Sequence, residues 1–464
     1  MSGIPIQLDY SMCMESHVGA IGGISELHLE GEIPTFKAAL CRLKSGIEKG
    51  EIGFWNLPES LETLRDVQEY AASVPESVTD VIVLGIGGSS LGMRAIAHAL
   101  GGPPELRLRQ QGDRAVYVAD NSDPWFLSRL LETLIPQNTL VVTISKSGST
   151  VETVAQWLVV RRWLETALGR RAREHQVFVT DPERGVLQEF AVAESIPFFA
   201  IPPNVGGRFS VLSAVGLLPS ILCNFDAKGM MQGAKELADA CRTEELSQNP
   251  AGMLAALHVL HQRLRGHNQH VLMPYADALR PFGDWWVQLW AESLGKRLDR
   301  RGRWIECGPT PISAIGATDQ HAQGQLFMEG PRNKLITFIE ISSAEKDFTL
   351  PKTAGPLSYL SGTSLTEILK AELQGSAVAL ANDGRPSLTL RVARLDARHL
   401  GALFFIFEAA TAIAGEMMGI DPFNQPGVEA GKRLTAGLLG RPGYEEEGQT
   451  ARRAMDGDQR HYAL

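Results

Sequence analysis

Two short segments of this chain share one order of residues: an apolar run of strand type, a loop of small and hydroxyl residues, and the start of a helix. The first is VIVLGIGGSSLGM at residues 81–93, and the second is LVVTISKSGSTVE at residues 140–152. Such a loop directs unpaired backbone N–H groups at one point, where the helix dipole adds partial positive charge. The repetition predicts two strand–helix units whose loops lie side by side at the carboxyl edge of a parallel sheet and bind phosphate.

The same alternation continues along most of the chain. Between residues 80 and 225, the β-branched runs VIVLGI, AVYVAD, LVVTIS and QVFVTD alternate with helical segments such as VETVAQWLVVRRWLETAL. A second set begins with HVLMPYAD and continues through FGDWWVQLWAESLGKR, KLITFIEIS and SLTLRVARL. Alternation of this kind makes βαβ crossovers and parallel sheets. We therefore expect an α/β fold of two stacked domains with a site at their junction.

The length of 464 residues exceeds what one ordinary core accommodates. We expect an N-terminal cap with a helix over residues 36–48, and a polar, loosely held C-terminal tail. The expected divisions are a cap at 1–75, a first α/β domain at 76–226, a second with a C-terminal helix at 227–440, and the tail at 441–464.

Composition narrows the classes of partner and compartment. A formal net charge of −9 argues against binding to nucleic acids, which requires clustered Lys and Arg. The five cysteines are widely spaced and form no CxxC pair, so they indicate neither a disulfide framework nor a zinc site. No basic region followed by an apolar core marks a secretory signal. These features predict a cytoplasmic protein.

One apolar segment, LGALFFIFEAATAIAGEMMGI at residues 400–420, is nearly long enough to span a bilayer. Glu408 and Glu416 interrupt it, and a charge near the membrane centre costs about 2.5 to 3.5 kcal/mol on insertion scales. We therefore expect a buried helix in a large core and no membrane partner.

The second loop carries the clearest chemical signal. It places four hydroxyls and one ammonium within six residues, a composition suited to a phosphate dianion. The Walker pattern GxxxxGK[ST] is absent, so a phosphomonoester fits better than a nucleoside triphosphate. The first loop, with Gly88 and Ser89, fits a tight strand-to-helix turn as well as a ligand site. The candidate phosphate residues of the second loop are Ser145, Lys146, Ser147 and Thr150.

Further candidates lie later in the chain. Arg208 follows two glycines in PNVGGRFSVLSAVG, which favours a planar charge held close to a ligand over an exposed turn arginine. Glu292 and Lys296 are four residues apart in QLWAESLGK, and taken alone they fit a surface ion pair of about 0.3 to 0.5 kcal/mol. His321 lies in a loop rich in Gly and Gln, where a structural histidine is the commoner case.

Two other sequence patterns can be explained without a binding site. The segment FNQPGVEAGKRL carries Gln425 and Lys432 at the start of a helix, whose polar side chains fit a solvated face. The two HxxH pairs lack a third ligand with metal spacing, so we expect no metal.

Taken in order, six segments resemble the glucose-6-phosphate isomerase family: VLGIGGSSLG, TISKSGSTVET, GGRFSVLSAVG, QLWAESLGK, TDQHAQGQ and FNQPGVEAGK, between roughly residues 80 and 435. The resemblance implies two doubly wound sugar-isomerase domains with parallel-rich sheets, a compact bacterial type of chain and a homodimer. It also implies that no metal or nucleotide cofactor is needed.

The resemblance assigns roles to residues in these segments. Glu292 is the implied general base, Arg208 stabilises the enediolate, and His321 and Lys432 open the sugar ring. His321 is expected to act in the site of the neighbouring subunit. Substrate binding falls to the phosphate loops and to two glutamines that orient hydroxyls: Gly88, Ser89, Ser145, Lys146, Ser147, Thr150, Gln288 and Gln425.

The implied reaction is the interconversion of glucose 6-phosphate and fructose 6-phosphate in glycolysis and gluconeogenesis. Two alternatives stay open. A regulator with the same domain type could bind a sugar phosphate without converting it, although it would not need Glu292, His321 and Lys432 together. Another aldose–ketose isomerase, acting on mannose 6-phosphate or an amino sugar, would use the same residue types.

Overall fold

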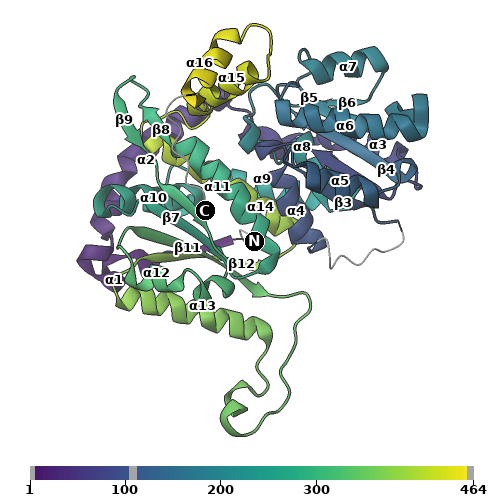
Figure 1. Ribbon diagram of the computed structural model, residues 1–464. Helices are drawn as coiled ribbons and strands as arrows, with labels where there is room; N and C mark the ends of the chain where they lie inside the picture. Colours follow the sequence, from purple (N-terminus) through teal and green to yellow (C-terminus); the bar gives the residue numbers. More distant parts are fainter. Residues whose placement is uncertain (1–5, 104–111, 457–464) are drawn as a thin grey trace.

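The computed structural model describes residues 6–103 and 112–456. Two five-stranded sheets, each covered by helices on both faces, lie side by side (Figure 1). The long helices α11 (Arg280–Leu294) and α14 (Ala397–Met417) run between them (Figure 1). The expected α/β fold class, with two doubly wound units and parallel-rich sheets, is confirmed.

The first sheet is parallel throughout and has the order β3–β2–β4–β5–β6. Because successive side chains of a strand point to opposite faces, Val81 and Val83 pack toward α3, α4 and α8, whereas Ile82 and Leu84 pack toward α5, α6 and α7. The strands are β2 (Asp80–Leu84), β3 (Ala115–Ala119), β4 (Thr139–Ser145), β5 (Gln176–Thr180) and β6 (Phe198–Ala200). The helices are α3 (Leu61–Ser73), α4 (Leu91–Gly101), α5 (Pro124–Thr133), α6 (Val151–Leu168), α7 (Val186–Glu194) and α8 (Ala214–Leu222).

The second sheet has the order β1–β12–β11–β7–β10, with β1 antiparallel and the other strands parallel. Leu335 and Ile339 of β11 face α10 and α14, and Ile336 and Phe338 face α12 and α13. The strands are β1 (Ile6–Asp9), β7 (Gln269–Pro274), β10 (Thr310–Ser313), β11 (Lys334–Ser343) and β12 (Ser387–Arg394). The helices that follow these strands or precede them are α10 (Pro250–Arg265), α12 (Gly324–Glu329) and α13 (Leu365–Asn382). A separate hairpin, formed by β8 (Lys296–Leu298) and β9 (Trp304–Cys307), follows α11.

Helix α14 lies at the centre of the hydrophobic core and packs against α2 (Glu26–Glu48), α9 (Ala227–Ala240), α10 and α11. Among the described residues, α14 is the one helix whose length and apolar composition would allow it to cross a membrane. Its most apolar stretch is entirely buried inside the protein. The expectation of a buried core helix is therefore confirmed. Its Glu416 is paired with Arg42 and Arg300, whereas neither carboxyl oxygen of the buried Glu408 has a hydrogen-bond partner within residues 6–103 and 112–456.

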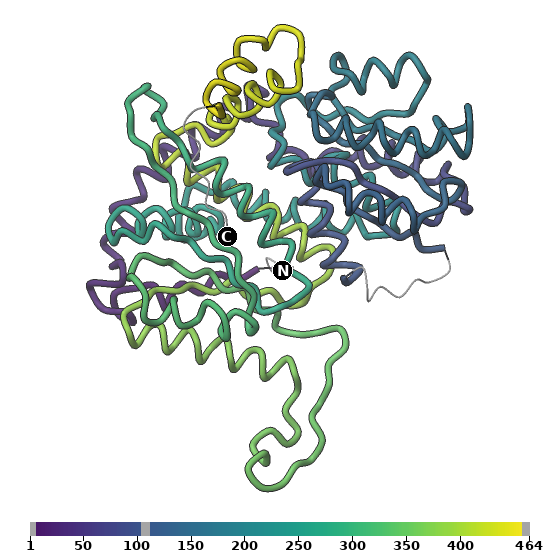
Figure 2. The backbone as a smooth tube through the Cα atoms, viewed as in Figure 1, coloured from purple at the N-terminus to yellow at the C-terminus, as the bar shows by residue number. Residues whose placement is uncertain are grey.

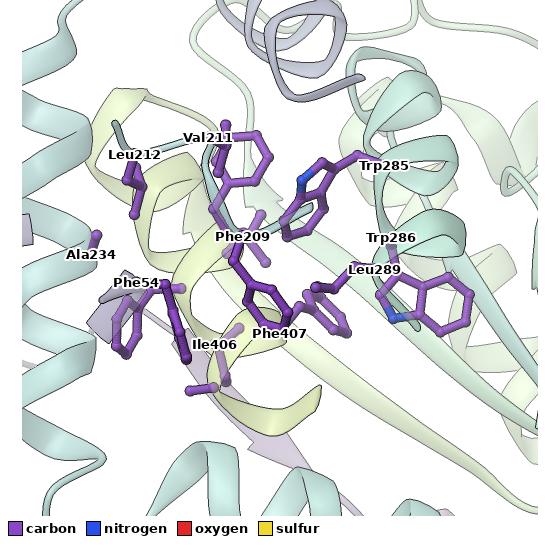
Figure 3. Packing of buried hydrophobic residues seen from close by; sticks show 14 of the residues in the cluster. Phe54, Phe209, Val211, Leu212, Ala234, Trp285, Trp286, Leu289, Ile406 and Phe407 are labelled. Carbon is purple, nitrogen blue, oxygen red and sulfur yellow. The ribbon is translucent and has the colours of Figure 1, made fainter. Parts of the chain in front are cut away.

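An aromatic cluster joins this centre to the loops of the first half (Figure 3). The rings of Phe54 and Phe209 lie 4.8 Å apart, and Phe209 is 5.4 Å from Phe423. On the other side, Trp285 of α11 meets Phe404 of α14 edge-on at 4.7 Å. Closely packed rings resist displacement, so the cluster forms a rigid base beneath the turn that carries Phe209.

The N-terminal residues are part of the second half as well as of the expected cap. Strand β1 pairs with β12, and α2 (Glu26–Glu48) packs on α14 and α10. Helix α2 begins ten residues before the expected position, because Ser25 caps it and its exposed Pro34 is tolerated inside. The buried stripe that includes Leu29 and Phe36 continues across the proline. A further helix, α1 (Glu15–Gly22), precedes α2.

The C-terminal tail is ordered where the sequence predicts a loose segment. Helices α15 (Glu429–Leu438) and α16 (Glu445–Met455) form a hairpin above the junction of the two halves (Figure 1). Gly437 and Gly448 let the two backbones approach so closely that a Cβ on Gly437 would lie 2.3 Å from the Gly448 nitrogen. The expectation of a loose tail is therefore wrong for α16, and residues 457–464 lie outside the described part.

Candidate active site

Three elements converge where the first half meets α11. The turn after β2 packs directly on the turn that carries Arg208, and both contact α11. A Cβ on Gly88 would lie 2.2 Å from the Gly207 carbonyl oxygen, so only glycine allows this approach of backbone to backbone. Gly88 and Ser89 are thereby placed beside the arginine turn.

Arg208 is the most constrained side chain at this junction. Its Nε donates to Ser293 Oγ at 2.7 Å, and its Nη1 donates to Gln425 Oε1 at 2.9 Å. Its Nη2 donates to the carbonyls of Pro422 at 2.5 Å and Asn424 at 3.1 Å. These acceptors come from α11 and from the turn after α14, so the guanidinium plane is fixed from two sides.

Glu292 lies near the end of α11 and faces the same guanidinium. Its Oε2 accepts from Arg208 Nη1 at 3.2 Å, and its Oε1 accepts from Gln288 Nε2 at 3.2 Å. Among the described residues, the side-chain oxygen of Gln288 is buried and has no hydrogen-bond partner. Glu292 itself is 31% exposed, which leaves its carboxylate within reach of a ligand.

Burial and charge act in opposite directions on Arg208. Its side chain is only 2% exposed, and this desolvation lowers the pKa of the guanidinium, while Glu292 and Asp421 raise it. Arginine starts from so high a pKa that it stays charged at neutral pH. A fixed cation beside a carboxylate base suits a reaction in which a proton is removed from carbon and negative charge develops on oxygen.

A cavity of about 1180 Å³ opens beside these groups. Its wall includes Glu292 and Lys296 from the end of α11 and the start of β8, and Gln425 from the turn after α14. A volume of this size accommodates more than one small polar ligand.

The hydroxyl-rich turn after β4 forms a compact cluster. Thr150 Oγ1 lies 2.9 Å from Ser145 Oγ and 3.4 Å from Ser147 Oγ, at the start of α6. Gly148 between them has a φ of +64°, a backbone conformation that glycine adopts without strain. These hydroxyls lie at the N-terminus of α6, where the sequence predicts an anion site.

Lys146 connects this turn with the loop that leads to Arg208. Its ammonium donates to the carbonyls of Pro203 at 2.8 Å and Val205 at 2.7 Å. Burial lowers its pKa, and Asp181 opposes the shift. The serine turn and the arginine loop are therefore held together by this cation.

The structure brings Arg208, Glu292, Gln288 and Gln425 together, but it places the expected ring-opening pair elsewhere. His321 is exposed at the end of a short turn after β10. Lys432 is exposed on α15, where it pairs with Glu429 at 2.8 Å. Across residues 6–103 and 112–456, no hydrogen bond or ion pair joins either side chain to Glu292.

Sequence reasoning missed the groups that position Arg208. Ser293 follows Glu292 directly and is fully buried, but an adjacent serine carries no signal of its partner. The Pro422 and Asn424 acceptors are backbone carbonyls, which every residue possesses. The spacing of Lys296 from Glu292 predicts a surface ion pair. In the structure Lys296 is only 8% exposed, and it donates to the Glu292 and Asn424 carbonyls.

Comparison with known proteins identifies the family of this chain. The model of the family described as Phosphoglucose isomerase matches residues 59–450. A glucose-6-phosphate isomerase of Carboxydothermus hydrogenoformans is 42% identical over 432 residues, covering 92% of this chain and 93% of that protein. One of Rubrobacter xylanophilus is 40% identical over 444 residues, covering 95% and 99%.

Solved structures give the same result. A hypothetical protein from Thermus thermophilus superposes with a TM-score of 0.82 at 36% identity, covering 94% of this chain and 99% of that one. A glucose-6-phosphate isomerase from Chlamydia trachomatis superposes with a TM-score of 0.75 at 26% identity, covering 85% and 76%. The chain belongs to the phosphoglucose isomerase family.

Proposed function

We propose that this chain is an aldose–ketose isomerase that interconverts glucose 6-phosphate and fructose 6-phosphate through ring opening and a cis-enediol(ate). The observation that carries the proposal is the contact between the buried Arg208 and the partly exposed Glu292. The names of the relatives at 40–42% identity support the same substrates. The reaction belongs to glycolysis and gluconeogenesis.

Glu292 acts in this proposal as the base that moves a proton between carbons 2 and 1 of the open sugar. A carboxylate that is ionised at neutral pH can accept this proton and return it. The intermediate develops negative charge on oxygen, and Arg208 stabilises this charge without losing its own proton. Gln288 and Gln425, which contact Glu292 and Arg208, orient the sugar hydroxyls.

The phosphate is proposed to bind at the turns after β2 and β4. Four groups of the second turn contribute hydroxyls or charge, namely Ser145, Lys146, Ser147 and Thr150. The neighbouring first turn contributes Gly88 and Ser89. Support comes from the cluster of hydroxyls at the start of α6 and from the packing of the first turn on the arginine loop.

Ring opening is assigned to His321 and Lys432. Imidazole has a reference pKa near 6.5, which suits proton transfer to and from a sugar ring. Since His321 is exposed and has no contact with Glu292 of its own chain, we propose that it enters the site of the neighbouring subunit in a homodimer. Gln320 fixes the turn before it by donating to Ser376 Oγ at 2.7 Å and the Glu372 carbonyl at 3.1 Å.

The proposed homodimer has a second support in the segment between β11 and α13, which projects from the rest of the chain (Figure 2). Phe348 and Tyr359 on this segment are 72% and 76% exposed, which is costly for rings on a solitary monomer. We also propose the division into a cap (1–75), two sugar-isomerase domains (76–226 and 227–440) and a tail (441–464). A cytoplasmic location is proposed from the wide spacing of the five cysteines, which form no CxxC pair in the sequence.

A coupled assay with several hexose phosphates tests the function. The purified protein is expected to convert glucose 6-phosphate and fructose 6-phosphate without added metal, and Glu292→Gln to lower kcat by about 10² to 10⁴ while ligand binding persists. A protein that binds these sugars without turnover would be a sensor instead. Faster turnover of mannose 6-phosphate or an amino sugar phosphate would identify a different isomerase.

A further inference from the structure

Lys296 occupies an unusual place between two parts of the site. It is the first residue of β8, separated from the end of α11 only by Gly295, and it is 8% exposed. Its ammonium donates to the Glu292 carbonyl near the end of α11 and to the Asn424 carbonyl at 2.9 Å. One side chain therefore connects the helix that carries the base with the turn that carries Gln425.

The same turn is held by Arg208. The guanidinium donates to the carbonyls of Pro422 and Asn424, so the Asn424 oxygen accepts from both cations. Gln425 follows directly and contacts Arg208 through its side chain. Removal of one of the two cations would leave the turn attached on one side only.

We propose that Lys296 is a positioning residue for the isomerisation, because it clamps the turn of residues 422–425 to the end of α11 and keeps Arg208 and Gln425 aligned with Glu292. This inference rests on the proposed function. Lys296 acts through other groups and does not itself transfer the proton.

A purely structural role would be poorly served by this residue. A largely desolvated ammonium costs free energy unless hydrogen bonds repay it, and an apolar side chain could fill the same space. The hydrogen bonds of Lys296 end on two backbone groups of the site, where errors of about 1 Å can cost as much as 10²-fold in rate. The ammonium is therefore placed where its geometry has the greatest effect on catalysis.

The protonation state of Lys296 changes within a range that can be measured. Burial and the neighbouring Arg208 lower its pKa to about 8, while Asp421, Glu292 and Cys307 act to raise it. Charge-assisted hydrogen bonds are roughly twice as strong as neutral ones. Loss of the proton therefore weakens the clamp as the pH rises through about 8, and kcat/KM, which reports the free enzyme, should fall there.

Three variants of the full-length protein test this inference. Lys296→Met removes the charge and keeps the length, and it is expected to lower kcat by about 10- to 100-fold with less than about a threefold change in KM. Lys296→Arg restores a permanent cation and should recover part of the rate. Lys334→Met is the matched control. Lys334 is buried to a similar extent, at 7% exposed, and it also donates to a backbone carbonyl, that of Pro331, but it lies at the amino end of β11.

The pH profile of kcat/KM separates positioning from general stabilisation. The wild-type decline above about pH 8 should be absent in Lys296→Met, move to higher pH in Lys296→Arg, and persist in Lys334→Met. Thermal unfolding of both Met variants should be similar. Wild-type kcat in Lys296→Met, or an unchanged alkaline decline, would overturn the inference; absence of isomerase activity in the wild type would instead refute the proposed function.

Discussion

Nε of Arg208 donates a 2.7 Å hydrogen bond to the fully buried hydroxyl of Ser293, the residue that follows Glu292. The helix position after the proposed base thus fixes the orientation of the proposed enediolate stabiliser. Because Glu292 and Ser293 are neighbours on α11, the hydrogen bond from Arg208 to Ser293 relates the guanidinium directly to the position of Glu292.

Ser293→Ala should therefore impair catalysis more than folding. A hydrogen bond to a charged group contributes about 1.5 to 3 kcal/mol, and four other acceptors still hold Arg208. We expect kcat/KM to fall about tenfold, which corresponds to about 1.4 kcal/mol. Steady-state kinetics checks this, with Ser220→Ala as control, since that buried hydroxyl donates to the Gly216 carbonyl within α8. Equal activity of the two variants would contradict the assignment.

Lys146→Ala is expected to weaken substrate binding more than turnover. The variant removes a cation from the proposed phosphate cradle and also the links to the carbonyls of Pro203 and Val205. Charge-assisted hydrogen bonds of this kind predict a rise in KM of about 10- to 100-fold. Competition by inorganic phosphate provides the independent measurement, because its inhibition constant should rise in parallel. An unchanged phosphate inhibition constant would place the anion elsewhere.

The sequence predicts the sheet elements of the first half well. The apolar runs that begin at Val81 and Leu140 become β2 and β4, and these strands are direct neighbours, with Val83 opposite Val142. Such strands are buried on both faces, so a continuous apolar run marks them in the sequence, and the connection through a helix makes them parallel. The loops that follow them therefore lie at the same edge, as expected.

Sequence patterns do not predict contacts between residues that are far apart in the chain. Strand β1 pairs with β12, although the two strands are far apart in the sequence. Arg391 Nη2 donates to Asp9 Oδ2 at 2.7 Å. Nothing in the residues around Asp9 indicates that partner. Helix α16 was missed because its polar surface resembles a disordered tail, whereas close packing at Gly437 and Gly448 holds it on α15.

The same limit applies to the site. Arg208 could be selected from the sequence because two glycines precede it, and Glu292 because its segment resembles a motif of the family. The acceptors that aim Arg208 could not, since the Pro422 and Asn424 groups belong to the backbone. Residue types thus indicate the chemistry, while the fold supplies the orientation.

Mixing two inactive proteins tests the shared site. His321→Ala should block ring opening and Glu292→Gln the proton transfer, but a mixed dimer would contain one site with both residues intact. Random pairing of equal amounts predicts recovery of about a quarter of wild-type activity. Activity is measured after subunit exchange has been verified by native mass spectrometry. No recovery in verified mixed dimers would show that His321 serves its own chain.

The buried Glu408 should make the free energy of unfolding depend on pH. Its carboxyl group is inaccessible and has no hydrogen-bond partner in the part of the chain that the structure describes, and desolvation raises its pKa well above 4.5. The folded state therefore keeps a proton that the unfolded chain releases above about pH 4.5, so this group's contribution to stability falls as the pH rises from there toward its folded pKa.

Glu408→Gln removes that titration while keeping the size of the side chain. The difference in unfolding free energy between variant and wild type should grow in favour of the variant, by up to about 1.4 kcal/mol per pH unit, as the pH rises above about 5 toward the folded pKa of Glu408. Urea unfolding at several pH values measures it, and Glu132→Gln on the surface serves as control, because its exposed carboxylate pairs with Arg129. Parallel stability curves for Glu408→Gln and the wild type would mean that this carboxyl ionises in the folded protein as readily as in the unfolded chain.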